Sequence, residues 1–358
     1  MERPGVLIGL SNVLTGTAVR VPAGPDLDAQ PSLRERLRTL ARRALEGRES
    51  FIHDAILHGR RARLFTNSHH LADFWRDNFP TEPEWRAAVG TPVPREPDVT
   101  LFAPIGVEGE PGASYASAER NEAYLFNTSC YLDLRACAMA AFARRVGSAG
   151  AVVHGGAVEL AGRGIAWTYP RELIHPTPSW GFLERADAKF AADGWLLVEA
   201  PSRAHALEKR LYVRTSVIAA YPEIAARILR CKFENVPELA PAQADSGAAR
   251  AEELLAAAAQ NDPQRILKAL PEERAREAVL RLLASPDARM MLDPELVWGK
   301  SRTVRSAVVS AAFAVRAGPG EAARPEAVPP FPCPGHEIRI EAVAGHPREI
   351  SRLIARKL

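Results

Sequence analysis

Five side chains of this sequence have the chemistry of a site for an anion or a metal ion: His154, Asp193, Arg214, Arg302 and Arg305. Guanidinium groups bind anions, and imidazole and carboxylate groups ligate metal ions. We therefore predict that these residues line one pocket. A structural role is the alternative, because His154 stands before two glycines and could satisfy buried backbone groups. Asp193 could likewise be a turn residue before Gly194.

The stretch from Gly150 to Ser202 must position His154 and Asp193. It contains short apolar runs that are separated by glycine turns, a pattern typical of strands and hairpins. Residues 191–194 would form the turn before the last of these runs. We predict strands, all within one common core, at Ala151–Val153, Ala157–Leu160, Ile165–Trp167 and Trp195–Val198.

This layout resembles the core of the HPr kinase/phosphorylase and phosphoenolpyruvate carboxykinase-like nucleotide-binding proteins. In that family a His-Gly pair on a small-residue strand is followed by a hairpin of the form dGrG. The hairpin leads into the strand before the phosphate loop. In this sequence, His154 and Gly155 stand at the first place, and the Gly-Arg-Gly of residues 162–164 stands at the second.

Two later motifs extend the resemblance, which covers roughly residues 121–236 and 289–358. Residues 208–215 resemble a strand pattern of carboxykinase-like proteins, and Arg214 lies within them. An Asp-Pro turn at residues 293–294 precedes Arg302 and Arg305, as a similar turn and an arginine pair precede a late core strand in the family. The resemblance implies that the five candidate side chains are the remnant of a kinase-like pocket.

The phosphate loop itself is missing from the corresponding stretch. Such a loop needs glycine N–H groups around the phosphates, a lysine, and a Ser/Thr hydroxyl on magnesium. The residues after Trp167 contain no glycine before Gly181 and no Gly-Lys-Ser/Thr, and three prolines remove N–H donors. The paired acids of the family are reduced to Asp193. We therefore expect no cofactor, and we expect Trp167 or Trp180 to fill part of the space of the loop.

Composition restricts the possible partners and compartment. The chain has 358 residues, with 46 basic and 43 acidic residues and a net charge of +3, so charge gives little support for nucleic-acid binding. The four cysteines are widely spaced without C-x-x-C, and neither disulfides nor a zinc site are expected. No signal-like segment and no run of about 18 apolar residues is present, so we expect a cytoplasmic protein without membrane contact.

The predicted fold class is α/β: a mixed-sheet, truncated HPr-kinase/carboxykinase-like core with an N-terminal α/β domain and a helical insertion. Strands and helices alternate in the first third of the sequence, and we place the N-terminal domain at residues 1–120. The degenerate kinase-like domain is placed at residues 121–358. An Ala-rich block at about residues 247–285 has helical spacing and is predicted to be the insertion.

Three functions fit this combination. Enzymes of the HPr kinase type act on proteins or peptides, so loss of the phosphate loop implies a pseudokinase that only binds a peptide. Truncated kinase-like peptide-binding proteins of this kind occur in crocagin-type pathways of ribosomal peptide natural product biosynthesis. There the protein would present or protect a precursor peptide for its modifying enzymes, and the peptide would add a strand to a sheet edge. The alternatives are a protein or peptide kinase with an atypical nucleotide site, and a structural subunit of an enzyme complex.

Overall fold

The computed structural model of the chain describes residues 6–7, 23–46, 49–128, 130–168, 178–200, 202–214, 217–218, 221–228, 233–234, 289–317, 335–340 and 347–358. The chain divides into two compact units. The N-terminal unit comprises Ile8–Gly147 and Phe233–Leu282. The barrel unit comprises Met1–Leu7, Ser148–Lys232 and Leu283–Leu358. Both units combine strands with helices, which confirms the predicted α/β class.

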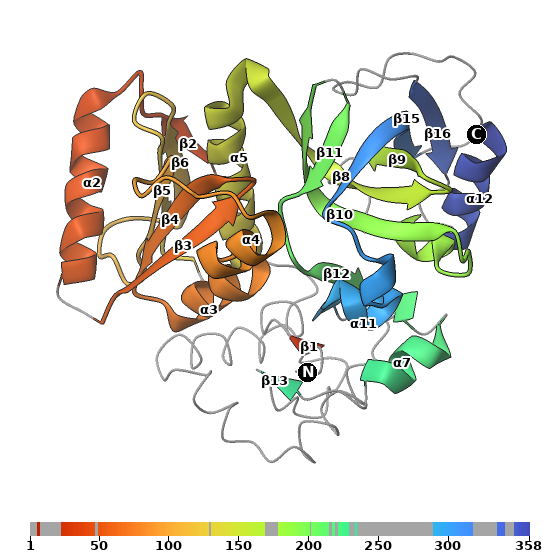
Figure 1. Cartoon of the computed structure of the whole chain (residues 1–358). Helices are drawn as coiled ribbons and strands as arrows, with labels where there is room; N and C mark the ends of the chain where they lie inside the picture. Colours follow the sequence, from red (N-terminus) through yellow and green to blue (C-terminus); the bar gives the residue numbers. More distant parts are fainter. Residues whose placement is uncertain are drawn as a thin grey trace. The chain divides into compact units, whose positions relative to one another are not determined.

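The N-terminal unit is built on a mixed sheet (Figure 1). In sheet order its strands are β2 (Ala23–Asp26), β6 (Ala113–Ser117), β7 (Glu122–Phe126), β5 (Val99–Ala103), β4 (Arg60–Thr66) and β3 (Phe51–Leu57). The three strands β7, β5 and β4 run parallel to one another. β3 pairs antiparallel with β4, and β6 pairs antiparallel with β7. β3 is therefore one edge of this sheet.

Helices lie on both sides of the sheet (Figure 1). They are α2 (Pro31–Glu46), α3 (His69–Asn78), α4 (Glu82–Val89) and α5 (Tyr131–Val146). On α2, Leu37 and Ala41 share one face of the helix and pack against Phe102 and Tyr124 of the sheet. At the start of α3, the Ser68 hydroxyl accepts a hydrogen bond from Leu71 N–H. The apolar face of α2 and the capping serine of α3 are therefore both visible in the sequence.

The N-terminal unit continues to Gly147, beyond the boundary at residue 120 that the sequence suggested. β7 pairs with both β5 and β6, so it is an interior strand of this sheet. α5 follows directly and packs on β7 and β5. The family resemblance had assigned these residues to the second domain because it begins near residue 121. The helical insertion expected at residues 247–285 lies outside the described residues.

The barrel unit contains a second sheet that closes on itself. In order its strands are β11 (Arg203–Ala206), β10 (Ala188–Glu199), β8 (Gly150–Leu160), β9 (Arg163–Thr168), β15 (Ser306–Ala317) and β16 (Gly335–Ile340). β11 also pairs with the start of β15, so the first five strands form a small barrel. β16 extends the sheet by pairing parallel to the later part of β15.

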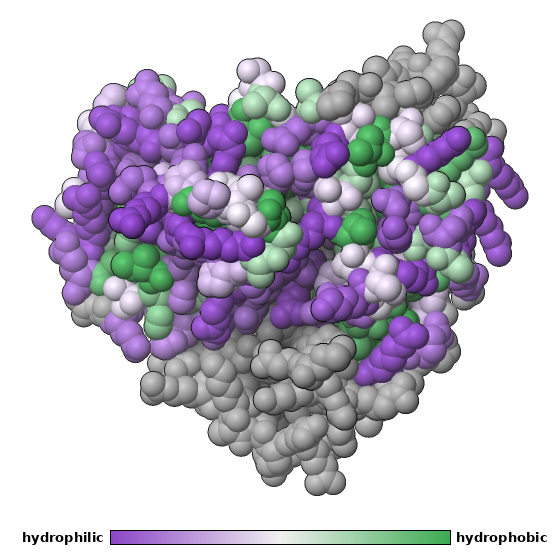
Figure 2. Space-filling model, viewed as in Figure 1, coloured by the Kyte–Doolittle hydropathy of each residue, from purple (hydrophilic) through white to green (hydrophobic). Residues whose placement is uncertain are grey.

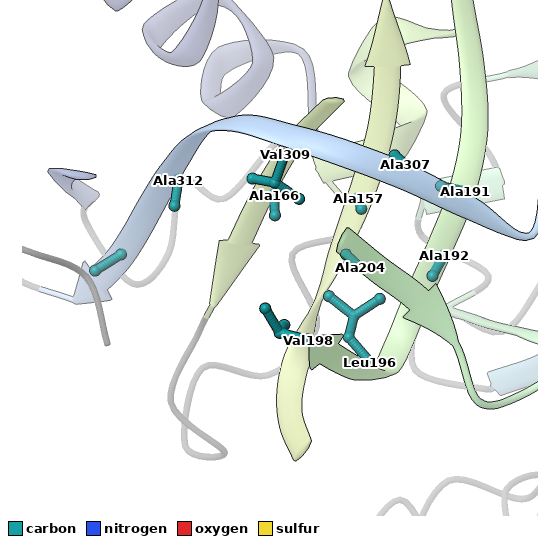
Figure 3. Packing of buried hydrophobic residues seen from close by; sticks show 11 residues of the cluster. Ala157, Ala166, Ala191, Ala192, Leu196, Val198, Ala204, Ala307, Val309 and Ala312 are labelled. Atoms are coloured by element: carbon teal, nitrogen blue, oxygen red, sulfur yellow. The ribbon is translucent and has the colours of Figure 1, made fainter. Parts of the chain in front are cut away.

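Small side chains fill the interior of this barrel (Figure 3). The interior contains larger residues such as Leu196 and Val309, but most of its side chains are alanines. Few strands make a narrow barrel, so larger side chains would not fit inside. The interior residues are Ala157, Ala166, Ala191, Ala192, Leu196, Val198, Ala204, Ala307, Val309, Ala312 and Ala314.

The four segments predicted as strands between Gly150 and Ser202 all lie in β8, β9 and β10. Two expected interruptions are absent, because β8 runs through Gly155 and Gly156, and β10 runs through residues 191–194. The turn predicted at residues 191–194 is therefore wrong. The irregularity there is a β-bulge between Phe190 and Ala192, which leaves the pairing with β8 intact on both sides.

Smaller elements complete the described residues. β12 (Leu211–Arg214) pairs antiparallel with β14 (Arg289–Leu292), which pairs with β1 (Val6–Leu7). The others are β13 (Phe233–Glu234), α7 (Pro222–Ile228), α11 (Pro294–Trp298), α12 (Pro347–Lys357), and the 3₁₀ turns η1 (Gly147–Ala149), η2 (Pro178–Phe182) and η3 (Lys300–Arg302). Among the described helices, none has the length and apolar character that a membrane crossing requires.

Candidate functional site

Two of the five candidate residues, His154 and Asp193, lie on the same outer face of the barrel. His154 on β8 is opposite Trp195 on β10, and Asp193 on β10 is opposite Gly156 on β8. Residues two apart on a strand point to the same side, so His154 and Asp193 are diagonal neighbours on this face. The pairing of β8 with β10 therefore brings together the imidazole and the carboxylate that the sequence singled out.

Asp193 is a buried carboxylate with a hydroxyl partner. The residue is 8% exposed, and Ser179 of η2 donates a hydrogen bond from Oγ to Asp193 Oδ2 at 2.6 Å. A carboxylate taken out of water needs such donors, because burial without them is costly. Asp193 is not a turn residue, since it stands inside β10. Its neighbour Gly194 has a φ of 143°, a backbone conformation that favours glycine.

The two glycines after His154 allow close packing of Trp167. A Cβ on Gly155 would overlap the carbonyl oxygen of Trp167. A Cβ on Gly156 would lie 2.5 Å from Cζ2 of the Trp167 indole. Gly156 is also directly opposite Trp167 in the pairing of β8 with β9, so the indole lies over the glycine. The His-Gly-Gly sequence thus has a packing explanation in this structure.

Fully buried aromatic side chains lie on β9, on η2 and beside η2, the turn whose Ser179 bonds Asp193. The Trp167 ring lies 6.4 Å from the Phe182 ring, and the Trp180 ring lies 5.3 Å from the Tyr221 ring. Tyr221 Oη donates a hydrogen bond to the Trp180 carbonyl oxygen at 2.9 Å. Within the described ranges of the chain, the indole nitrogens of Trp167 and Trp180 have no hydrogen-bond partner. This part of the barrel's outer face is therefore covered by apolar packing.

By the family resemblance predicted from the sequence, the phosphate loop would correspond to the connection between β9 and η2. Residues 169–177 of this connection lie outside the described residues. That Trp167 or Trp180 fills part of the space of the loop therefore stays a prediction. The burial of both indoles is compatible with it.

Arg302 binds backbone carbonyl groups. Its Nε donates to the Ala188 oxygen at 2.9 Å, its Nη1 to the Leu183 oxygen at 3.1 Å, and its Nη2 to the Arg185 oxygen at 2.8 Å. The guanidinium also lies 4.9 Å from the centre of the Trp298 ring. Burial lowers the pKa of Arg302 from its usual value. Its hydrogen bonds hold the turn before β10 and are not directed at an anion.

The other two arginines belong to different elements. Arg214 is the last residue of β12 and is opposite Arg289 of β14 in the separate antiparallel sheet. Arg305 is exposed just before β15, and its carbonyl oxygen accepts a hydrogen bond from Ala206 N–H at 3.0 Å. The guanidinium of Arg302 is bound to the turn before β10, and a single pocket lined by all five side chains stays a prediction.

One partner of the site and one motif were not predicted from the sequence. Ser179 stands in a Pro-rich stretch, and no spacing in the sequence indicates that it bonds Asp193. Gly299, Lys300 and Ser301 form a Gly-Lys-Ser sequence, but they follow the helix α11 and open the three-residue turn η3. A phosphate loop instead follows a strand and opens a full helix. Lys300 and Ser301 are exposed in this turn.

The chemistry available at the site is limited. His154 is half-buried, and its ring lies 5.1 Å from the Trp195 ring. One imidazole and one carboxylate are fewer than the three protein ligands of a typical catalytic zinc site. In this arrangement both side chains contribute to packing on the barrel's outer face.

No family model and no curated protein matches this chain.

Proposed function

We propose that this protein is a non-catalytic peptide-binding protein, a degenerate kinase-like scaffold. The observation that carries the proposal is the environment of Asp193. By the resemblance, this residue is what remains of the paired acids that the HPr kinase-like family has. A carboxylate that serves phosphoryl transfer holds Mg²⁺ beside the phosphates. Asp193 is instead buried and bonded to Ser179, which directly precedes the fully buried Trp180. The sequence after Trp167 also lacks the glycines, lysine and hydroxyl of a phosphate loop.

The peptide as ligand follows from the family resemblance. Enzymes of the HPr kinase type recognise proteins or peptides, and this recognition does not need the phosphate loop. In the proposed role the protein presents or protects a precursor peptide for separate modifying enzymes of ribosomal peptide natural product biosynthesis in the cytoplasm. A net charge of +3 on 358 residues gives little attraction for nucleic acid.

Two titrations test this proposal. Calorimetry with ATP and Mg²⁺ should show no binding, because the groups that hold phosphates are missing. A dissociation constant in the micromolar range would favour the alternative, a kinase with an atypical nucleotide site. Fluorescence anisotropy with labelled short peptides encoded beside the gene should show saturable binding, at about micromolar to nanomolar dissociation constants. If no such peptide binds, the protein is not a peptide-binding scaffold.

A further inference from the structure

The outer edge of β3 has backbone groups that point away from the sheet. The N–H of Ile56 donates to the Pro80 carbonyl oxygen at 2.7 Å and so faces away from β4. Arg61 of β4 lies opposite Ile56. Its N–H donates to the Asp98 carboxylate and its carbonyl oxygen accepts from the Asp98 N–H, so both groups face away from β3. Along an antiparallel pair every second residue faces the same way. Ile52 and Asp54 therefore also direct their N–H and C=O groups outward.

An apolar row of side chains crosses the sheet and ends at this edge. In register, Ile52 is opposite Phe65, Phe65 is beside Phe102, and Phe102 is beside Tyr124. The rings of Phe65 and Phe102 stack at 5.2 Å, as do those of Phe102 and Tyr124. Helix α2 packs over this row, yet Ile52 at its end is 58% exposed. Figure 2 shows hydrophobic surface near the start of β3 among mostly hydrophilic residues.

The next edge residue on the same face is Asp54, and two arginines balance the charge of its carboxylate. Asp54 accepts hydrogen bonds from Arg63 Nε at 2.7 Å and Nη2 at 3.0 Å, and from Arg61 Nη1 at 2.5 Å. Because both arginines bind the carboxylate, Asp54 does not place an unpaired charge at the edge. Sheet edges that avoid association are usually short, bulged or charged. β3 has seven residues, and within the described part of the chain the backbone hydrogen bond at its outer edge is that of the Ile56 N–H to the Pro80 carbonyl oxygen.

We infer that the outer edge of β3, from Phe51 to Ala55, binds an extended segment of a separate peptide as an added strand. The outward groups of Ile52 and Asp54 bond the peptide backbone, since alternating donors and acceptors are what an extended chain supplies. The peptide places an apolar side chain beside Ile52 and thereby continues the aromatic row. Two residues away it places a polar side chain beside Asp54. This inference rests on the proposed peptide-binding function and names the site and the pattern of the ligand.

A displayed library of random peptides of about nine residues tests it with the full chain, because this length spans a strand. Peptides selected on the wild-type protein should carry an apolar residue and, two residues away from it, a polar residue. Ile52→Lys adds a charge at the edge, and Ile52→Pro removes the outward N–H without breaking a bond to β4. Both should weaken the selected peptides by about tenfold or more. On binding, the amides of Ile52 and Asp54 should become protected from hydrogen exchange.

The matched control is Val89→Lys, which makes the same charge change at an exposed apolar residue of the same unit. It should change affinity by less than about twofold. Selected peptides that bind wild type and both Ile52 variants equally would overturn the β3 site while leaving peptide binding intact. Failure to select any peptide would instead count against the proposed function. A dimer that Ile52→Lys dissociates, seen by sedimentation, would show that a second copy of the chain occupies the edge and would also overturn the inference.

Discussion

The contact between Gly156 and Trp167 depends on the absence of a side chain at position 156. The indole of Trp167 is fully buried, and its Cζ2 atom lies 2.5 Å from the place where a Cβ of residue 156 would stand. That distance is too short for a real contact. Gly155 has the same relation to the Trp167 backbone. The two glycines that follow His154 are thus explained by the packing of one tryptophan. A motif that resembles a functional one can be retained for packing alone.

Gly156→Ala should therefore destabilise the protein by about 1–3 kcal/mol, because the indole must move in a filled core. Urea unfolding measures the change. The same substitution in a Trp167→Leu background should cost clearly less, since the smaller side chain leaves room for the methyl group. An equal cost in both backgrounds would mean that the glycine is needed for its backbone and not for this contact.

Arg302 and Arg305 offer a direct comparison of a bound and an exposed guanidinium. Arg302→Met removes the hydrogen bonds to the carbonyl oxygens of Leu183, Arg185 and Ala188. We expect a loss of about 1.5–3 kcal/mol in unfolding free energy, because three part-buried or exposed carbonyl groups lose a charged donor. Arg305→Met should change stability by less than about 0.5 kcal/mol, since Arg305 is exposed. Similar losses for both variants would argue against the structural role of Arg302.

At the scale of elements, β3, β4 and α4 are joined by a charged network around Arg61. Its guanidinium binds both Asp54 of β3 and Glu82 of α4, at 2.5 Å in each case. Burial raises the pKa of Asp54, but hydrogen bonds from Arg63 and Arg61 outweigh it, and the pKa lies below the usual 3.8. The carboxylate thus stabilises the fold fully above its unfolded pKa. That contribution is lost as pH falls through the lowered folded pKa.

This predicts an acid-sensitive part of stability that Asp54→Asn removes. In urea unfolding the wild type should lose stability between pH 5 and pH 2, and the variant should be less stable at pH 7 and lose less on acidification. Asp26→Asn is the control at an exposed aspartate of the same sheet. An unchanged pH profile in the Asp54 variant would show that the ion pairs do not contribute measurably, as holds for many exposed pairs.

The sequence allowed some of these elements to be predicted, and physical reasons explain the rest. The short apolar runs around Gly162 predicted a hairpin correctly, because turn residues act locally. Closure of the barrel was not predictable, since Ala204 and Ala307 pair across about a hundred residues of chain. The buried Ser179–Asp193 bond was missed for a different reason, because no local pattern in the Pro-rich stretch marks Ser179 as a donor to that carboxylate. The sequence did indicate the histidine and the acid of the outer face, but not that packing covers Asp193.

At the scale of the whole molecule, the boundary of the N-terminal unit decides which fragment can fold. A chain cut at Arg120 loses β7, an interior strand, and α5, whose buried residues include Leu134, Met139 and Phe142. A fragment that ends at Gly147 keeps both elements. We expect cooperative urea unfolding for a fragment of residues 8–147 and none for residues 8–120. Without β7, both β5 and β6 lose the strand that they pair with. Circular dichroism during urea titration makes the comparison. A cooperative transition in the shorter fragment alone would restore the boundary at residue 120 and would assign β7 and α5 to the fold of the barrel unit.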